Sequence, residues 1–341
     1  MMRFYVRKAT CCLYRRKNIL DGIRQKYLST LTNEEVREKR NKIFEKEKAR
    51  QRALITRVEK IEVNYVGVPE ECTLLMNKNI STPYDCTMHV NEMLRIRSVI
   101  PLVNNELWDM HRPLEDNCTL DFLHFKIEDP HEVNKAFWRS CSFMLGMIIE
   151  RAFKDSVYVQ LHSWPRPDVR SGSFVYDVNL STDDWEPRTD ELRTLKGMLQ
   201  KLSMRDIKFE RLELPLSVAE EMFEDNRFKL HQLLSIAEHS KDGNTVTAYR
   251  LDNHIDVSAG PMISTTKHLG FVDVASVHKL DTSEGLIYRF QGVALPRQLP
   301  LNSFAFKTLV DRAKKLNTTG LPKASEKIPT GETDTVRAST V

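Results

Sequence analysis

The chain has 341 residues, of which 41% are apolar and 29% charged, so it is long enough to bury a sizeable core and to hold two domains with tails. No apolar run approaches the roughly 20 residues that a membrane-spanning helix needs, which argues against a membrane span. The formal net charge is +4, but residues 1–60 hold 18 Lys and Arg against 7 Asp and Glu, whereas residues 61–341 hold 33 against 40. A uniformly basic, RNA-coating body is therefore excluded.

The six cysteines show neither a CxxC pair nor the spacing of a zinc finger. Unpaired cysteines of this kind are typical of reduced thiols in an intracellular compartment. We therefore expect no structural zinc, no disulfide and no cofactor.

Residues 1–30 hold eight Lys and Arg against one acidic residue, Asp21, and interleave them with apolar side chains. This Arg-rich, acid-poor and amphipathic composition is typical of a mitochondrial transit peptide, although it is poorer in serine than most. The segment is predicted to be a presequence that is removed. The alternative is a basic RNA-binding arm that stays attached.

Residues 31–57 are predicted to form a charged helical arm. Thr32 with Glu35 makes a capping box, which indicates a helix start, and the apolar positions that follow form only a thin stripe. Such a helix can stand away from a core, either solvated or docked onto RNA or a neighbouring protein. The segment is net basic, and its candidate RNA-binding side chains are Arg37, Lys39, Arg40, Lys42, Lys46, Lys48, Arg50, Arg52 and Arg57.

Residues 58–127 have the pattern of short strands with one helix. A hairpin over 60–66 and 73–76 is followed by a helix over 83–97. Asn104 and Asn105 can take the positive φ of a tight turn between two further strands, and a strand over 119–125 closes the unit. That order fits a small β-grasp fold.

The passage from Leu102 to Met110, followed by Arg112-Pro113-Leu114, resembles the TGS domain of threonyl-tRNA synthetases. In that family the passage reads alanine-x-valine-asparagine-glycine-glutamate-leucine-tyrosine-aspartate-leucine, and then arginine-proline-leucine. TGS domains also occur in GTPases and other regulators. The segment that follows must therefore distinguish a synthetase-like protein from a GTPase or another regulator.

Residues 128–316 are predicted to form an α+β domain. A helix over 132–153 carries apolar side chains at helical spacing. Strands over 156–161, 173–178, 207–214 and 245–251 alternate with helices over 189–204 and 218–225, and further strands run up to Gly292. A last helix over 304–316 precedes a polar tail, residues 317–341, which we expect to be disordered. The fold class is therefore α+β, with a basic arm, a β-grasp domain and a larger domain.

Two passages of the larger domain resemble the tRNA-editing site of threonyl-tRNA synthetases. Phe137-Trp138-Arg139-Ser140-Cys141-Ser142-Phe143 matches the helix that carries two histidines in the family, where Arg139 and Phe143 stand here. Ile255-Asp256-Val257-Ser258-Ala259-Gly260-Pro261-Met262 matches isoleucine-aspartate-leucine-cysteine-x-glycine-proline-histidine. Ser258 takes the position of the cysteine and Met262 that of the last histidine.

The resemblance implies an editing-like domain whose site has degenerated. An arginine stays protonated near neutral pH, and neither phenylalanine nor methionine carries a useful proton. A serine without a neighbouring base is a poor nucleophile. Asp256 and Lys229 match polar positions of the family and leave a residual hydrolase open, although a buried ion pair is the expected role. The degenerate positions are Arg139, Phe143, Lys229, Asp256, Ser258 and Met262.

A synthetase's N-terminal half without a catalytic core after residue 316, combined with a presequence, resembles a mitochondrial large-subunit ribosomal protein. This resemblance implies a non-enzymatic structural constituent in the mitochondrial matrix that binds ribosomal RNA and neighbouring ribosomal proteins. Two alternatives stay open. The chain could be a free-standing deacylase of mischarged tRNA that uses Asp256 and Lys229, or a regulator that binds RNA through its TGS domain away from the ribosome.

Overall fold

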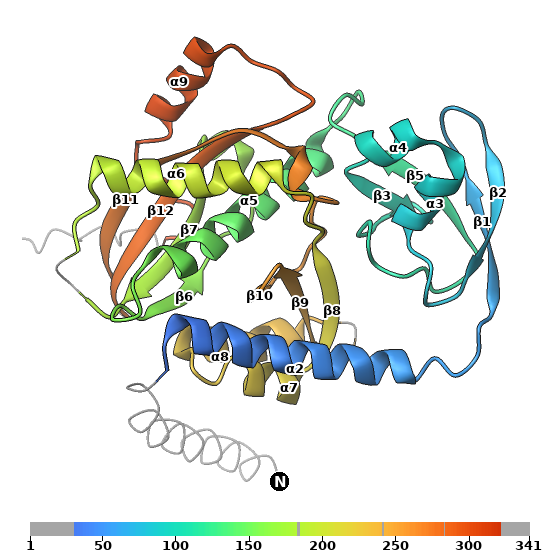
Figure 1. The fold of residues 1–341 in the computed structure, drawn as a ribbon, viewed down its shortest axis with the longest axis horizontal. Coiled ribbons are helices and arrows are strands. Elements are labelled where there is room, and N and C mark those ends of the chain that lie inside the picture. Colours follow the sequence, from blue (N-terminus) through green and yellow to red (C-terminus); the bar gives the residue numbers. More distant parts are fainter. Residues whose placement is uncertain (1–30, 183–184, 241, 283, 322–341) are drawn as a thin grey trace, which may run out of the picture.

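The computed structural model describes residues 31–182, 185–240, 242–282 and 284–321 (Figure 1). The predicted presequence, residues 1–30, and most of the predicted tail, residues 322–341, lie outside the described residues. Sheets of five, three and four strands organise the rest, so the prediction of a mixed α+β fold is confirmed. Across the ranges that the structure describes, every helix is too short or too polar to cross a membrane.

The charged helix α2 (Asn33–Ala53) lies along the body of the protein (Figure 1). Its predicted capping box, Thr32 with Glu35, is present. Val36 and Phe44 are buried, and Phe44 belongs to a core that it shares with the three-stranded sheet. Two buried apolar side chains with ion pairs around them are thus enough to dock the helix, and the expectation that it stands away from a core is wrong.

The five-stranded sheet consists of β1 (Lys60–Tyr65), β2 (Cys72–Asn77), β3 (Ile100–Val103), β4 (Glu106–Leu107) and β5 (Cys118–Leu123). Its order is β2-β1-β5-β3-β4, with β1 parallel to β5 and the other pairs antiparallel. The predicted turn between β3 and β4 is confirmed, since Asn104 and Asn105 have φ of 51° and 64°.

The single helix predicted over 83–97 is two helices, α3 (Pro83–Val90) and α4 (Glu92–Arg97). Asn91 breaks the chain between them because its backbone is extended, at φ −163° and ψ 140°. Its side-chain oxygen accepts a hydrogen bond of 2.7 Å from the backbone N–H of Met93. Asn91 therefore ends one helix and caps the next.

The four-stranded sheet has the order β11-β12-β7-β6. It consists of β6 (Val159–Ser163), β7 (Phe174–Leu180), β11 (Leu269–Thr282) and β12 (Gly285–Pro296). Helices α5 (His131–Ala152) and α6 (Thr189–Met204) pack on it, and their apolar faces share one core with it (Figure 1). Gly146 permits the close approach of α5 to β7, because a Cβ there would lie 2.5 Å from the ring of Tyr176.

The three-stranded sheet consists of β8 (Glu210–Pro215), β9 (Thr245–Leu251) and β10 (His254–Val257), in the order β10-β9-β8. Helices α7 (Leu216–Met222) and α8 (Arg227–Glu238) share its core with α2. The sequence prediction missed α8. Its start is marked by Asn226, whose side-chain oxygen accepts from the N–H groups of Phe228 and Lys229 at 3.0 and 3.1 Å, which is the N-cap arrangement.

The last helix, α9 (Ser303–Arg312), ends earlier than predicted. Beyond it the chain returns to the four-stranded sheet. The backbone N–H of Asn317 donates to Gln291 Oε1 at 2.6 Å, and its side-chain amide donates to the Ser173 carbonyl at 2.8 Å. The disorder predicted from residue 317 is therefore wrong for residues 317–321, which these contacts hold in place.

Candidate functional site

Phe143, one of the six positions of the predicted degenerate site, fills the interior between the sheets. The side chain is 0% exposed. Its ring makes edge contacts with Trp164, Phe209 and His254, at centroid distances of 6.5, 5.7 and 4.9 Å. The space around this position is filled by aromatic rings.

Asp256 and Lys229 are brought together as a buried ion pair, with Lys229 Nζ 2.6 Å from Asp256 Oδ1. The Tyr176 hydroxyl donates to Oδ2 at 2.6 Å and Trp164 Nε1–H donates to it at 3.1 Å, while the N–H of Val257 donates to Oδ1 at 2.8 Å. Four donors thus surround the carboxylate.

These contacts determine the charge of Asp256. Burial would raise the pKa of this carboxyl, but the positive charge of Lys229 and the hydrogen bonds more than offset it, so the pKa lies below its ordinary value. Burial and the neighbouring Asp256 raise the pKa of the Tyr176 hydroxyl. A fully ionised carboxylate with four donors and 0% exposure has no access to a substrate water and holds elements together instead.

Arg139 and Met262 join α5 to the segment that follows β10. Arg139 Nη1 donates to the carbonyl of Pro261 at 2.9 Å, and burial lowers the pKa of this guanidinium from its usual high value. Met262 is 1% exposed, with its sulfur 3.5 Å from Ser140 Oγ. Ser258 is half-buried, and its Oγ accepts only a local hydrogen bond of 3.3 Å, from the N–H of Gly260.

The same segment contacts the five-stranded unit through Asp109. The N–H of Met262 donates to Asp109 Oδ1 at 2.9 Å, and the Tyr249 hydroxyl donates to Oδ2 at 2.7 Å. A glycine is required at position 260, because the φ of Gly260 is +65° and a Cβ there would lie 1.8 Å from the Tyr249 hydroxyl oxygen. The segment around the two predicted degenerate positions therefore serves as a joint between the two parts of the chain.

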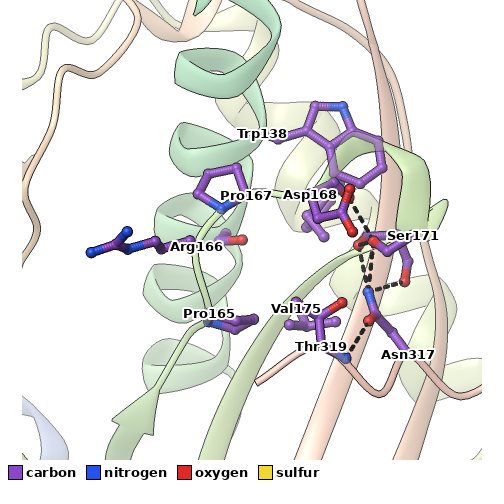
Figure 2. Close-up of a pocket in the computed structure, with 12 residues that line it drawn as sticks. Trp138, Pro165, Arg166, Pro167, Asp168, Ser171, Val175, Asn317 and Thr319 are labelled. Carbon is purple, nitrogen blue, oxygen red and sulfur yellow. Dashed lines mark hydrogen bonds between the residues drawn. The ribbon is translucent and has the colours of Figure 1, made fainter. Parts of the chain in front are cut away.

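A small pocket lies beside Trp138 (Figure 2). Its internal volume of about 10 Å³ is the size of one water molecule. The side-chain amide of Asn317 donates to Ser171 Oγ at 3.0 Å, and Ser171 Oγ donates to the Asp168 carbonyl at 2.6 Å. An open depression of about 250 Å³ lies beside Tyr158. None of the six predicted positions lines either one.

Arg40, a predicted RNA-binding residue, is instead buried at 2% exposure. Its Nη1 lies 3.0 Å from Glu150 Oε1 on α5, and its Nη2 lies 2.6 Å from Asp225 Oδ2. Glu150 Oε2 is 2.7 Å from His254 Nδ1 on β10. The network joins α2, α5 and β10. Arg40 is therefore unavailable to RNA, and the sequence prediction did not identify the structural role of Glu150, Asp225 and His254.

The pKa directions of Arg40 and Glu150 show that both members of this pair are ionised. Burial opposes the charged form of Arg40, but Asp225 and Glu150 raise its pKa above the ordinary value. Burial would raise the pKa of Glu150, but His254 and Arg40 lower it. The negative charge of Glu150 is therefore matched by Arg40 inside the protein.

The remaining cations of the arm divide into two groups. Arg37 donates to the Glu150 carbonyl at 2.9 Å, Lys39 pairs with Glu224, and Lys48 lies 2.5 Å from Glu210. The other predicted side chains are exposed: Lys42, Lys46, Arg50, Arg52 and Arg57. Of these, Arg50 also pairs with Glu47 at 2.7 Å while 55% of its side chain stays exposed. The outward cations form a surface that we call the α2 outer face.

Within the described ranges, no group of three or more His, Cys, Asp or Glu side chains is placed to hold a metal ion. The cysteines that the structure describes, Cys72, Cys86, Cys118 and Cys141, are free thiols, and burial raises the pKa of Cys86 to about 12.

Comparisons with known proteins show two kinds of similarity, although no family model matches the chain. It is 47% identical over 287 residues to the large ribosomal subunit protein mL39 of Drosophila melanogaster, which covers 83% of this chain and 86% of the relative. It is 28% identical over 223 residues to the cytoplasmic threonine–tRNA ligase 1 of Homo sapiens, covering 63% of this chain and 28% of the ligase. A probable threonine–tRNA ligase 1 of Dictyostelium discoideum is 26% identical over 282 residues, with 81% and 37% covered. The chain thus spans most of mL39 but only 28% and 37% of the lengths of the two ligases.

Proposed function

The chain belongs to the mL39 family of large ribosomal subunit proteins, and from this premise we propose that it is a non-enzymatic structural constituent of the mitochondrial large ribosomal subunit. The observation that carries the proposal is the 47% identity along 86% of the length of a ribosomal protein. Residues 1–30 would direct the chain to the mitochondrial matrix, as their basic, amphipathic composition supports.

We further propose that residues 58–127 are a TGS-like β-grasp domain and residues 128–316 an editing-like domain. The similarity to threonine–tRNA ligases covers 63% of this chain and supports both assignments. The first is also supported by the path of the five-stranded sheet, in which a hairpin and a helix precede a strand, β5, that runs parallel beside β1.

The proposed absence of enzymatic activity is supported by the chemistry of the six positions. We propose that Arg139, Phe143, Ser258 and Met262 replace two histidines, a cysteine and a histidine of an ancestral editing site. Phe143 and Met262 are packed inside the protein, and Asp256 already accepts four hydrogen bonds or ionic contacts. These side chains offer neither a base, a nucleophile nor space for an aminoacyl group.

The α2 outer face is the proposed contact with ribosomal RNA. Lys42 and Lys46 lie one helical turn apart, and Arg50, Arg52 and Arg57 continue the exposed series. Residues 61–341 hold 33 Lys and Arg against 40 Asp and Glu. The body of the protein is therefore net negative, like RNA, and as a whole is less suited to contact RNA than the α2 outer face is. Neighbouring ribosomal proteins are the proposed partners of that body.

Sedimentation of mitochondrial extracts at moderate and high salt tests the proposal. A structural constituent is expected to remain with the large subunit at both salt concentrations. Migration at the top of the gradient would instead favour the free regulator, and serine release from seryl-tRNA above the buffer rate would favour the deacylase.

A further inference from the structure

Phe304 is the most exposed large apolar side chain of the described residues, at 81% exposure. It lies in the first turn of α9, far from the α2 outer face. In Figure 1, α9 (red) and α2 (blue) lie on opposite sides of the molecule. An aromatic ring in water gains free energy when another apolar or aromatic surface covers it.

The outward direction of Phe304 is fixed by the way that α9 is held. Asn302 Oδ1 accepts from the N–H of Ala305 at 2.8 Å and so fixes the start of the helix. Phe306 is 7% exposed and stacks on Phe271 of β11, with ring centroids 5.2 Å apart. Since residues two apart on a helix point about 200° from each other, burying Phe306 directs Phe304 to the solvent.

Exposed cations follow Phe304 along α9 and just beyond its end. Lys307 lies one turn after Phe304, and Arg312 and Lys315 follow it; all three are exposed and form no ion pair within the described ranges. The acidic residue of α9, Asp311, lies 2.7 Å from Lys314 Nζ. Phe304, Lys307 and Arg312 of α9, together with Lys315 just beyond its end, define what we call the α9 face. It has one aromatic ring, three exposed cations and one carboxylate, Asp311, whose charge Lys314 and Lys307 offset.

We propose that the α9 face binds a single-stranded segment of RNA, with an unpaired base stacked on Phe304 and phosphates next to Lys307, Arg312 and Lys315. The proposal rests on the proposed function, which brings the chain into contact with ribosomal RNA. Stacking of bases on aromatic side chains beside a basic surface is how proteins bind single strands. An A-form duplex would not fit, because its bases are stacked inside.

The composition of the face favours RNA over two other partners. Insertion into a membrane requires a wide apolar face, whereas Phe304 shares its side of the helix with Lys307, Thr308 and Asp311. The centre of a protein interface is depleted in charged residues, lysine in particular. With α2 on the opposite side, the chain would join two separate RNA segments.

Equilibrium binding of a short oligouridylate to the full chain, measured over a series of salt concentrations, tests the α9 face. Every protein in this assay also carries the substitutions K42Q, K46Q and R52Q, so that the α2 outer face contributes little to RNA binding. F304A is expected to weaken binding at least about fivefold without changing the salt dependence. The triple variant K307Q/R312Q/K315Q is expected to lower the slope of log K against log salt by about 2, at about 0.7 for each single-strand phosphate contact.

Two further variants make the test specific. M204A is a matched control, because Met204 is 79% exposed on α6 and its loss is expected to leave binding unchanged. F304W is expected to retain binding, and its fluorescence should be quenched by oligouridylate but not by polyphosphate. Circular dichroism verifies that each variant is folded.

Equal effects of F304A and M204A would overturn the α9 face. The proposal would also be overturned if F304A lost binding to anionic vesicles but still bound oligouridylate normally. That result would indicate that Phe304 contacts a membrane. Because this assay uses isolated RNA, it is independent of sedimentation. Sedimentation with the large subunit together with an F304A variant that binds normally would refute the α9 face alone.

Discussion

Arg40 of α2 and Glu150 of α5 form an ion pair inside the protein, with 3.0 Å between Nη1 and Oε1 and 2% exposure of each side chain. Glu150 also contacts His254, and Arg40 also contacts Asp225. A buried pair of this kind contributes little net stability by itself, but removing one partner leaves an unmatched charge. The helix predicted as a charged arm is therefore an integral part of the folded body.

Replacing Arg40 with methionine should destabilise the protein strongly. R40M keeps much of the side-chain volume but leaves Glu150 and Asp225 without their cation, and we expect a loss of about 3–5 kcal/mol in the free energy of unfolding. Urea denaturation followed by circular dichroism measures it. The control is K42M at an exposed position of the same helix, expected within about 0.5 kcal/mol of the wild type. Equal midpoints for the two variants would contradict the structural role of Arg40.

Two histidines at the joint should make stability depend on pH. Burial lowers the pKa of His111 and of His268 from 6.5 to about 4. His111 Nε2 lies 3.0 Å from the Ser264 carbonyl oxygen and His268 Nε2 lies 2.7 Å from Ser264 Oγ, so both occupy the joint between the two parts of the chain. Between pH 6.5 and 4 the unfolded chain binds more protons at these sites than the folded one, and stability therefore falls as the pH is lowered through this range.

Urea denaturation at several pH values between 7.5 and 4.5 measures this dependence. Each histidine contributes at most roughly 3 kcal/mol. In the double variant H111Q/H268Q, the free energy of unfolding should depend less on pH because these two contributions are gone. In H239Q, at an exposed position, the pH dependence should be unchanged. An unchanged slope in the double variant would rule out titration of these two groups as its source.

The elements predicted best are those whose pattern is local. Helix α6 and strand β9 have the predicted bounds, since amphipathic spacing and alternation depend on neighbouring residues. The break at Asn91 was missed, although an asparagine within a helical pattern is itself a capping signal. The apolar composition of α2 was too weak to predict docking, because its partners Glu150 and Asp225 are 110 and 185 positions away in the chain.

The candidate site shows the same limit. The match of residue types placed Asp256 and Lys229 among the six positions, and the structure has them 2.6 Å apart. The sequence could not show that Trp164 and Tyr176 complete the coordination of Asp256, because these donors come from separate strands and loops. It also could not divide the cations of α2 into a buried and an exposed group, which depends on the face that docks.

Reversing the charge of the α2 outer face should weaken attachment to the ribosome. K42E/K46E/R52E removes three exposed cations without touching the buried network. We expect release from the large subunit at a lower salt concentration than the wild type, because fewer counterion-releasing contacts remain. Sucrose gradients over a salt series provide the measurement. K126E/K201E, at two exposed lysines outside α2, is the control, and release of both variants at the same salt concentration would argue against a specific RNA contact at α2.

Lys229 should be required for folding because it neutralises Asp256. K229M leaves a carboxylate at 0% exposure with only neutral donors, and a loss of about 3–5 kcal/mol in unfolding free energy is expected. The double variant K229M/D256N removes the charge as well and should recover part of the loss. Thermal and urea denaturation of the two variants measure this difference in unfolding free energy. A double variant no more stable than K229M would show that the pair is not coupled in this way.

Restoring a histidine at position 143 should disrupt packing without restoring chemistry. In F143H an imidazole replaces a ring that is 0% exposed and surrounded by Trp164, Phe209 and His254. A polar group without a partner in that position is expected to cost about 1–3 kcal/mol of stability. Serine release from seryl-tRNA should stay at the buffer rate in F143H as in the wild type, because Asp256 remains inaccessible and Met262 still packs on Ser140. F143L, which keeps the site apolar, separates the polar effect from lost volume. Release by F143H above the buffer rate would mean that the filled cleft can still admit an aminoacylated RNA end, and the assignment as a non-enzymatic constituent would then fail.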